Sequence, residues 1–205
     1  MQNHVHSGLA PRFILASGSE ARKSMLNKAG LKFSVISADI DESMIKQQYQ
    51  DQDIAQCATM LACEKAKKVS LMEMGAIVIG ADSMLEINGT RLSKPVGLDG
   101  LRNHLKQLRG NSHYLISAAA IYQDGMLQGS VMGRARLTMR DFSDEFLAHY
   151  IAQVGIDVCA SVGGYQLEGM GAQLFDNVEG DYFTILGLPL FKLCALMRHK
   201  GWLKI

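Results

Sequence analysis

One stretch of the chain, residues 76–95, constrains the fold more than any other. Its first part, Ala76–Ile79, is apolar throughout and predicts a buried strand that ends at Gly80-Ala81-Asp82. A hairpin should follow, because Asn88-Gly89 lies between two short runs that contain apolar residues, which is a strong local signal for a tight turn. We therefore expect the rest of the chain to be organised around this strand.

The length of the turn decides which residue faces Asp82. A two-residue turn would pair Ile87 with Thr90. Counting back along the two strands, Asp82 would then lie opposite Pro95. Lys94 would point to the other face, because neighbouring side chains on a strand alternate between faces.

A three-residue loop would give a different register. With Gly89 in the left-handed conformation, Glu86 would pair with Thr90, and Asp82 would lie directly across from Lys94. An acid and a base placed in this way suit the activation of a water molecule beside a phosphate. The alternative is a surface ion pair, which contributes little to stability. Spacing alone leaves both readings open.

Composition limits the classes of protein to which the chain can belong. The 205 residues, 48% of them hydrophobic, suffice for one soluble domain, or for one large lobe and a small one. The formal charge of +1 gives no net field that would attract nucleic acid or an anionic membrane, so we expect neither as a partner. Any phosphate ligand must be held by a local cluster of charges.

The cysteines and the N-terminus predict a cytoplasmic protein. The four cysteines include no Cys-x-x-Cys pair, so free thiols in a reducing compartment are expected. The first twelve residues are polar and lack the apolar segment of a secretory signal, and no apolar run is long enough to span a membrane. We expect residues 1–12 to be flexible and residues 13–205 to form a single domain.

The beginning of the expected domain carries a candidate anion site. Residues 13–20 predict a short strand followed by a turn, Ser17-Gly18-Ser19-Glu20, that opens a helix. Either serine could cap this helix, and Ser17 with Glu20 has the spacing of a capping box. Unpaired N–H groups and the helix dipole at such a turn favour the binding of an anion. The guanidinium of Arg22 could contact the same anion. The alternative is a capped helix with a solvated arginine.

Two further segments carry charged side chains that could bind a metal ion or an anion. Asp39-Ile40-Asp41-Glu42 places three carboxylates in four residues, and carboxylates are ligands for Mg²⁺ or Mn²⁺. The alternative, which is the more common one for an acidic loop, is that these side chains are simply solvated. Residues 53–69 have a clear helical period of apolar side chains, and Lys65 falls on that apolar stripe. A lysine there must meet an anion or extend along the stripe to water.

The remaining segments complete an α/β pattern. Helices are predicted at about residues 98–108, 144–151 and from the Gly187-Leu188-Pro189 turn to His199, with Ser143 as the cap of the second. Strands are predicted at about residues 113–122, 131–140 and 182–186. Strands and helices alternate early and a pair of longer strands follows, so we expect an α/β chain with a mixed sheet.

Five separate pieces of the sequence resemble one family, the Maf nucleoside triphosphate pyrophosphatases, which are also called septum-formation inhibitors. They cover roughly residues 13–198, and their order and spacing match as well. The pieces are Ile14-Leu15-Ala16-Ser17-Gly18-Ser19 with Arg22, Asp39-Ile40-Asp41-Glu42, Glu64-Lys65-Ala66, Gly80-Ala81-Asp82 with Lys94-Pro95, and Glu179-Gly180-Asp181-Tyr182 leading to Gly187-Leu188-Pro189-Leu190.

The resemblance implies both a fold and a reaction. The fold would be like that of the inosine-triphosphate pyrophosphatases, with a long mixed sheet, flanking helices and two lobes around a nucleotide cleft. Members hydrolyse a nucleoside triphosphate to the monophosphate and pyrophosphate with a divalent cation, Mg²⁺ or Mn²⁺. They are cytoplasmic and commonly form homodimers. The substrate expected here is a modified or non-canonical nucleotide, and the family's other name implies a link to cell-division arrest.

The resemblance also assigns roles to individual residues. The catalytic base falls on Asp82, which would orient or deprotonate the attacking water. Lys65 and Lys94 would stabilise charge that spreads over the phosphoryl oxygens. Glu42 and Asp82 would hold the metal ion. The triphosphate would be bound by Ser17, Ser19 and Arg22.

Departures from the family pattern fall where members differ in substrate. The three specificity positions are Ala21, Ser83 and Glu168, where members that act on dTTP and UTP usually have arginine, threonine and glutamine. Members that act on 7-methyl-GTP share the glutamate but tend to have tryptophan at the first position. A carboxylate only accepts hydrogen bonds, so it suits the N–H donors of a guanine edge. An Asp-Lys pair common in the family is replaced by Ala160 and Ser161.

Two other classes of function fit the same residues. The chain could be a nucleotide-binding regulator of cell division with little turnover, or a metal-dependent phosphatase that releases orthophosphate. Glu42, Lys65, Asp82 and Lys94 are all present, which argues against a pure binder, because a binder has no need of a water-activating carboxylate. The identity of the released product separates the phosphatase from the pyrophosphatase.

Overall fold

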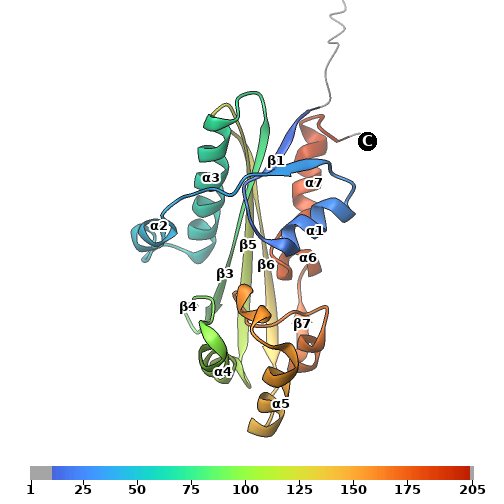
Figure 1. The fold of residues 1–205 in the computed structure, drawn as a ribbon. Coiled ribbons are helices and arrows are strands. Elements are labelled where there is room, and N and C mark those ends of the chain that lie inside the picture. Colours follow the sequence, from blue (N-terminus) through green and yellow to red (C-terminus); the bar gives the residue numbers. More distant parts are fainter. Residues whose placement is uncertain (1–10, 204–205) are drawn as a thin grey trace, which may run out of the picture.

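The computed structural model describes residues 11–203, and within them seven strands form one mixed sheet (Figure 1). The strand order is β2-β1-β3-β5-β6-β7, and β4 pairs with β3. Pairing is parallel in β2-β1-β3 and antiparallel elsewhere. The strands are β1 (Phe13–Leu15), β2 (Phe33–Val35), β3 (Ile77–Ile87), β4 (Thr90–Leu92), β5 (Ser112–Gln123), β6 (Met126–Met139) and β7 (Phe175–Glu179). The predicted α/β fold with a long mixed sheet is confirmed.

Helices cover the sheet at both of its ends (Figure 1). They are α1 (Glu20–Lys28), α2 (Glu42–Gln48), α3 (Ile54–Met72), α4 (Gly97–Leu108), α5 (Asp144–Val154), α6 (Tyr182–Ile185) and α7 (Leu190–His199), with 3-10 turns η1 (Asp157–Ala160) and η2 (Met170–Leu174). No helix among the described residues is long and apolar enough to cross a membrane.

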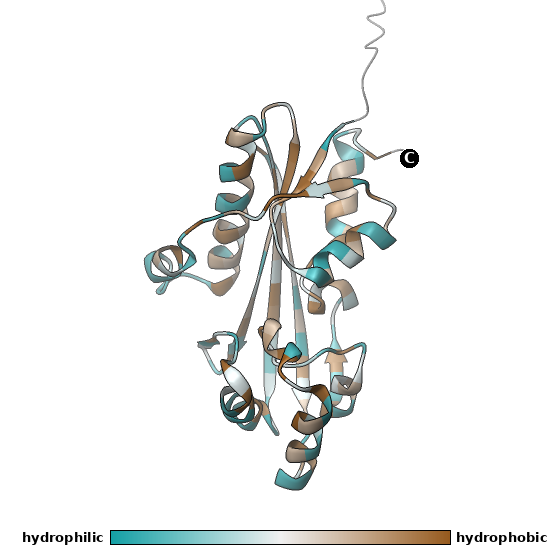
Figure 2. Ribbon diagram, in the orientation of Figure 1, coloured by the Kyte–Doolittle hydropathy of each residue, from teal (hydrophilic) through white to brown (hydrophobic). Residues whose placement is uncertain are grey.

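Three apolar clusters fill the spaces between the sheet and its helices, and Figure 2 shows the apolar residues concentrated on the long strands and the inner helix faces. Helix α3 packs on one face of β3 and β5, and α1 and α7 pack on the opposite face at the same end. Helices α4 and α5 pack around the other end of the long strands. Strands β3, β5 and β6 therefore form a spine that joins two lobes.

The sheet has a gap along one edge of β3. Strand β1 pairs with β3 only at Ile77–Ile79, and β4 pairs with it only at Leu85–Ile87. Between these two short strands, residues 80–84 of β3 pair with β5 on their other side. The backbone along this stretch is therefore open to contacts from side chains and ligands.

The hairpin after this gap has the two-residue turn. Ile87 pairs with Thr90, and Asn88 and Gly89 adopt φ values of 50° and 76°, as a tight hairpin turn requires. The three-residue register, with Asp82 paired across from Lys94, is not formed. The strand that was predicted to end at Gly80-Ala81-Asp82 continues without interruption to Ile87, because β5 pairs with it along most of its length.

Other sequence expectations are corrected in detail. The strand predicted at residues 182–186 is wrong: these residues form the short helix α6, which begins after Asp181, whose carboxylate accepts a hydrogen bond from the Thr184 N–H. Ser19, rather than Ser17, caps α1, so the capping box with Glu20 is not formed. Strand β7 was not predicted. Ser143 caps α5 as expected.

Near the beginning of the described residues, Arg12 is attached to the sheet. Residues 1–10 of the segment expected to be flexible lie outside the described residues, as do residues 204 and 205. Arg12 forms an ion pair with Glu73 at 2.8 Å, and its carbonyl accepts the Ile77 N–H. The backbone around Arg12 is therefore already tied to the sheet.

Helix α3 lies in close contact with the open stretch of β3, and Gly80 makes this possible. A Cβ atom at Gly80 would stand 2.2 Å from the Ala62 carbonyl oxygen and 2.7 Å from the Ala66 nitrogen, both of them backbone atoms of α3. Backbone in a packed helix cannot move aside in the way that a flexible side chain can. The absence of a side chain at Gly80 thus sets the distance between α3 and β3.

Replacing Gly80 should therefore destabilise the protein. We expect Gly80→Ala to lower the free energy of unfolding by roughly 1–3 kcal/mol or more, because α3 must shift away from β3. The control is Gly100→Ala in α4, where the nearest atom would be 3.7 Å away and where alanine should stabilise the helix by roughly 0.5–1 kcal/mol. Urea denaturation of both variants measures the difference. Equal stability of the two would contradict this packing.

The lobe built by α4 and α5 contains a buried polar cluster. His113 is fully buried, and its Nε2 lies 2.7 Å from the hydroxyl oxygen of Tyr165. Nδ1 of His113, Nε2 of His104 and the Tyr150 hydroxyl are buried without a hydrogen-bond partner among the described residues. Burial, with a smaller contribution from His104, lowers the pKa of His113 from 6.5 to about 4. His113 is therefore neutral in the folded protein at pH 7.

This burial predicts that acid destabilises the fold. Between pH 6.5 and about 4 the unfolded chain binds a proton at His113 that the folded chain does not, so the free energy of unfolding should fall as the pH falls through this range. His113→Gln removes the titrating group, and its stability should depend less on pH there. Chemical denaturation at several pH values tests this. An unchanged slope in the variant would show that His113 is not responsible.

Candidate functional site

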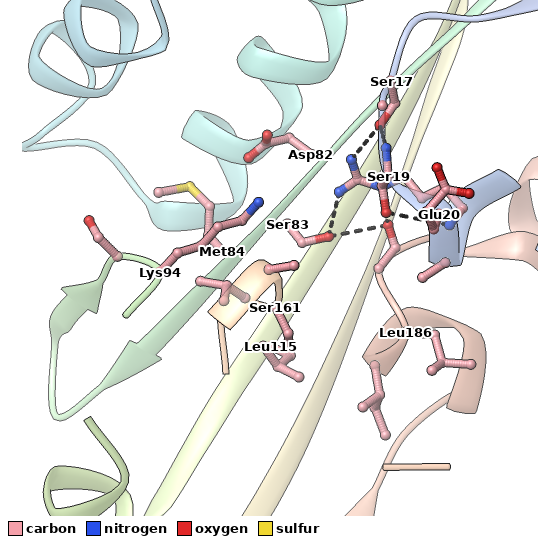
Figure 3. Close-up of a pocket in the computed structure, with 18 of the residues that line it drawn as sticks. Ser17, Ser19, Glu20, Asp82, Ser83, Met84, Lys94, Leu115, Ser161 and Leu186 are labelled. Atoms are coloured by element: carbon pink, nitrogen blue, oxygen red, sulfur yellow. Dashed lines mark hydrogen bonds between the residues drawn. The ribbon is translucent and has the colours of Figure 1, made fainter. Parts of the chain in front are cut away.

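A cavity of about 920 Å³ opens at the gap in the sheet (Figure 3). Its walls come from both lobes: the loop before α1, the start of α2, one side chain of α3, the open part of β3, the loop after β4, the segment around η1 and the loop between α6 and α7. All ten site residues that the sequence predicted line this cavity: Ser17, Ser19, Ala21, Arg22, Glu42, Lys65, Asp82, Ser83, Lys94 and Glu168.

The charged centre of the cavity is a lysine shared by two carboxylates. Nζ of Lys65 lies 2.6 Å from Oε1 of Glu42 and 2.7 Å from Oδ1 of Asp82. Lys65 and Asp82 are buried, at 8% and 6% exposure, while Glu42 is partly open. Lys65 therefore meets anions rather than extending to solvent. The ammonium group and the two carboxylates compensate one another for the hydration lost on burial. Removal of any one of these charges would leave a buried charge without its partner.

The chain places these three charges for identifiable reasons. Lys65 lies on the buried stripe of α3, and Gly80 lets that helix approach β3 two residues before Asp82. Glu42 is the first residue of α2, which starts there because the Asp41 carboxylate accepts hydrogen bonds from the N–H groups of Ser43 and Met44.

The protonation of Glu42 follows from this arrangement. Burial raises its pKa, but the hydrogen bond and charge of Lys65, together with Lys46, outweigh burial and lower the pKa to about 2. Nζ of Lys46 lies 3.2 Å from Oε2 of Glu42. Glu42 is therefore ionised at neutral pH, and both of its oxygens face ammonium groups.

The acidic loop supplies one cavity residue instead of three. Asp41 caps α2, and the carbonyl of Asp39 accepts a hydrogen bond from Lys68 outside this cavity. Among residues 11–203, no three Asp, Glu, His or Cys side chains lie close enough together to hold one metal ion. The carboxylates available to a cation in the cavity centre are thus those of Glu42 and Asp82.

The predicted anion site at the start of α1 contains two serines and a buried arginine. The Ser19 hydroxyl accepts a hydrogen bond from the Arg22 N–H and so caps the helix. The Ser17 hydroxyl accepts from the Ser19 N–H at 3.3 Å. Arg22 is 9% exposed, and burial lowers the pKa of its guanidinium, while the charges of Asp82 and Glu42 raise it.

Lys94 and the residues predicted to set specificity lie around the rim and walls. Lys94 lies in the loop between β4 and α4, in the same cavity as Asp82. Ser83 follows Asp82 on β3, Ala21 lies in the first turn of α1, and Glu168 lies in the loop before η2. Ala21 and Glu168 are exposed, so a base could reach both.

Several cavity residues were not predicted from the sequence. Lys46 and Arg91 add positive charge to the wall formed by α2 and β4. Lys46 could have been found from its spacing, since it lies four residues after Glu42 on a helix. Arg91 depends on the hairpin register, because it pairs opposite Glu86 only with the two-residue turn. Sequence alone left that register open.

Taken together, the cavity is suited to a polyanion. The start of α1 offers N–H groups and a positive dipole end, and four further cationic side chains line the walls: Lys46, Lys65, Arg91 and Lys94. Asp82 is the carboxylate at the centre of these cations that could accept a proton from a water molecule.

Curated proteins of similar sequence cover nearly the whole chain. The nucleoside triphosphate pyrophosphatase of Nitrobacter hamburgensis is 46% identical over 192 residues, which is 94% of this chain and 95% of that protein. The 7-methyl-GTP pyrophosphatase of Mesorhizobium japonicum is 43% identical over 195 residues, which is 94% of this chain and 98% of that protein.

A solved structure and a family model complete the comparison. A nucleoside-triphosphatase, dITP/XTP pyrophosphatase, of Mycobacterium abscessus is similar with a TM-score of 0.40 and 14% identity, covering 93% of this chain and 95% of that one. The family model described as Maf-like protein matches residues 12–200. This match spans both lobes and every residue of the site described above, so the chain belongs to the Maf family.

Proposed function

We propose that this protein hydrolyses a nucleoside triphosphate to the nucleoside monophosphate and pyrophosphate. The observation that carries the proposal is the buried Lys65 bridge between Glu42 and Asp82, in a cavity whose walls carry four further cationic side chains: Arg22, Lys46, Arg91 and Lys94. The names of the relatives from Nitrobacter and Mesorhizobium support the same reaction class.

The triphosphate binds along the wall formed by the start of α1 and the surrounding cations. Ser17 and Ser19 lie at the N-terminus of α1, where N–H groups and the helix dipole favour phosphate. Lys94 approaches from the loop after β4 and Lys65 from α3. Lys46 and Lys65 come from α2 and α3, and Arg91 and Lys94 come from β4 and the loop after it. The phosphates therefore lie between the two lobes rather than on α1 alone.

The residues at the centre fit a divalent cation that arrives with the substrate. Mg²⁺ is usually bound by one or two carboxylates together with substrate phosphates and water. Glu42 and Asp82 supply two carboxylates, and each contacts Lys65 through one oxygen. The second oxygen of Glu42 contacts the partly exposed Lys46, so a cation would have to displace that ammonium group. A Mg²⁺ or Mn²⁺ ion held there would neutralise phosphate charge and make a water molecule more acidic.

Asp82 is proposed to orient and deprotonate the attacking water. Its Oδ1 is fixed by Lys65 at 2.7 Å, which leaves Oδ2 to accept a hydrogen bond from water. Lys65 and Lys94 then stabilise the negative charge that spreads over the phosphoryl oxygens. Attack at the α-phosphorus releases pyrophosphate, whereas attack at the γ-phosphorus would release orthophosphate, as in the alternative of a phosphatase.

The base is proposed to be a purine that offers hydrogen-bond donors, such as a guanine or a modified guanine. Glu168 is exposed in the cavity wall, and its carboxylate only accepts hydrogen bonds. It would also favour the positive charge of a 7-methylated ring, in line with the substrate in the name of the Mesorhizobium relative. Ala21 leaves space beside the base where a larger residue would contact it.

Replacement of Asp82 tests the reaction. We expect Asp82→Asn to reduce the rate of pyrophosphate release by roughly 100-fold or more, because the amide keeps the contact with Lys65 but does not accept the proton of water. Asp51→Asn, at an exposed turn outside the cavity, is the matched control and should be unaffected. Pyrophosphate and orthophosphate are measured separately with Mg²⁺. Orthophosphate as the first product, or tight binding without turnover, would favour the phosphatase or the regulator instead.

Replacement of Glu168 tests the choice of base. Glu168→Gln offers a donor as well as an acceptor, so the preference for guanine triphosphates over UTP should fall by roughly tenfold, the expected effect of losing one hydrogen bond to a charged group. Glu145→Gln, which lies outside the cavity, should keep the wild-type preference. The ratio of kcat/KM values for GTP, 7-methyl-GTP and UTP measures this. An unchanged ratio would mean that Glu168 does not read the base.

A further inference from the structure

The guanidinium of Arg22 is almost completely occupied by the protein itself. Its Nε donates to the Gly187 carbonyl at 2.8 Å, and Nη1 donates to the Ser17 hydroxyl and to the Ala81 carbonyl, both at 3.0 Å. Nη2 donates to the Ser83 hydroxyl at 2.9 Å (Figure 3, dashed lines). A guanidinium has five N–H groups, so these four bonds leave one.

These contacts join segments that are distant in the sequence. Arg22 lies on α1, Ala81 and Ser83 lie in the open stretch of β3, and Gly187 lies between α6 and α7. The Ala81 carbonyl lies in the gap between β1 and β4, so Arg22 takes the place of a neighbouring strand as its hydrogen-bond donor. Arg22 thus fixes the backbone immediately before Asp82.

The hydroxyl of Ser17 is constrained by the same guanidinium. Its oxygen accepts one hydrogen bond from Nη1 of Arg22 and one from the Ser19 N–H. A serine hydroxyl has two acceptor lone pairs and one donor proton, so both lone pairs are used inside the protein. The proton then has to point away from these two donors, and Ser17 lines the cavity.

We propose that Arg22 is a positioning residue that aims the Ser17 hydroxyl proton at a phosphate oxygen of the substrate, instead of binding that phosphate itself. The proposal deepens the proposed function and rests on a phosphate ligand occupying the cavity. It replaces the role of direct substrate ligand that the sequence resemblance gave to Arg22. Ser17 is then the group that touches substrate, and Arg22 acts through it.

The same network limits what Ser83 can do. Ser117 donates its proton to the Thr184 carbonyl at 2.8 Å, so it can only accept at its contact of 2.9 Å with Ser83. The single proton of Ser83 is therefore given to Ser117 or to the Gly187 carbonyl at 3.2 Å. Ser83 has no proton left for a base and serves as part of the frame that holds Arg22.

A double-mutant cycle on Ser17 and Arg22 tests the proposal. The probe is inorganic tripolyphosphate with Mg²⁺, which has no base, and its affinity is measured by calorimetry. Ser17→Ala should weaken binding by roughly tenfold or more, because a hydrogen bond to a charged group is lost. Arg22→Lys keeps the charge but does not span the four acceptors, so it should weaken binding similarly. The double variant should bind about as weakly as the weaker of the two single variants.

Other outcomes of the cycle would overturn the proposal. If the losses in Ser17→Ala and Arg22→Lys add, each residue contacts phosphate on its own. Guanidinium ion should restore binding in Arg22→Ala but not in the variant that also carries Ser17→Ala, and rescue in both would likewise contradict the role given to Ser17. Lys28→Ala, at the exposed end of α1, is the control for the charge of that helix and should bind normally.

Two further measurements keep the test decisive. If the Arg22 variants fail to fold, Ser17→Ala and Ser17→Thr suffice: unchanged affinity in Ser17→Ala overturns the proposal, whereas a loss in Ser17→Ala that Ser17→Thr avoids supports it. Turnover of nucleoside triphosphates by the wild type is measured separately. If the tripolyphosphate affinities of the variants match the predicted double-mutant cycle but the wild type hydrolyses no nucleoside triphosphate, the proposed hydrolysis is refuted and the role of Arg22 is still supported.

Discussion

The ion bridge of Lys65 with Glu42 and Asp82 is the interaction on which the rest of the site depends. A buried ammonium is stable only when carboxylates replace its lost hydration, and here the two carboxylates come from α2 and β3 while the lysine comes from α3. The bridge therefore fixes the positions of α2, α3 and β3 relative to one another. It also requires α3 to lie close to β3, which is why a residue without a side chain, Gly80, stands where the two meet.

The gap in the sheet turns this bridge into a site. Because β1 and β4 are short, the middle of β3 is open on one edge, and the cavity forms there between the two lobes. An open strand edge exposes unpaired backbone groups, and the protein satisfies one of them with the guanidinium of Arg22. The same guanidinium holds the Ser17 hydroxyl. Anion binding and strand geometry are thus linked through one side chain.

Much of this arrangement could be predicted from the sequence because local patterns carried it. The apolar stripe of α3 predicted that Lys65 lies on the buried face of that helix, as it does. Asn88-Gly89 predicted the hairpin, and its two-residue register was one of the two considered. The ten residues selected from the family motifs all line one cavity. What could not be predicted depends on distant contacts. Residues 182–186 have strand-like composition, but Asp181 caps them into a helix, and the hydrogen bonds of Arg22 reach a carbonyl 165 residues away.

The central claim is that Asp82 directs water to the α-phosphorus of a bound nucleotide. It is tested most directly by hydrolysis of a nucleoside triphosphate in ¹⁸O-labelled water, followed by mass spectrometry of both products. The account predicts that the label appears in the nucleoside monophosphate and that the pyrophosphate is unlabelled. Label in pyrophosphate would mean attack at the β-phosphorus, and label in orthophosphate would mean attack at the terminal phosphate. Either result would contradict the mechanism.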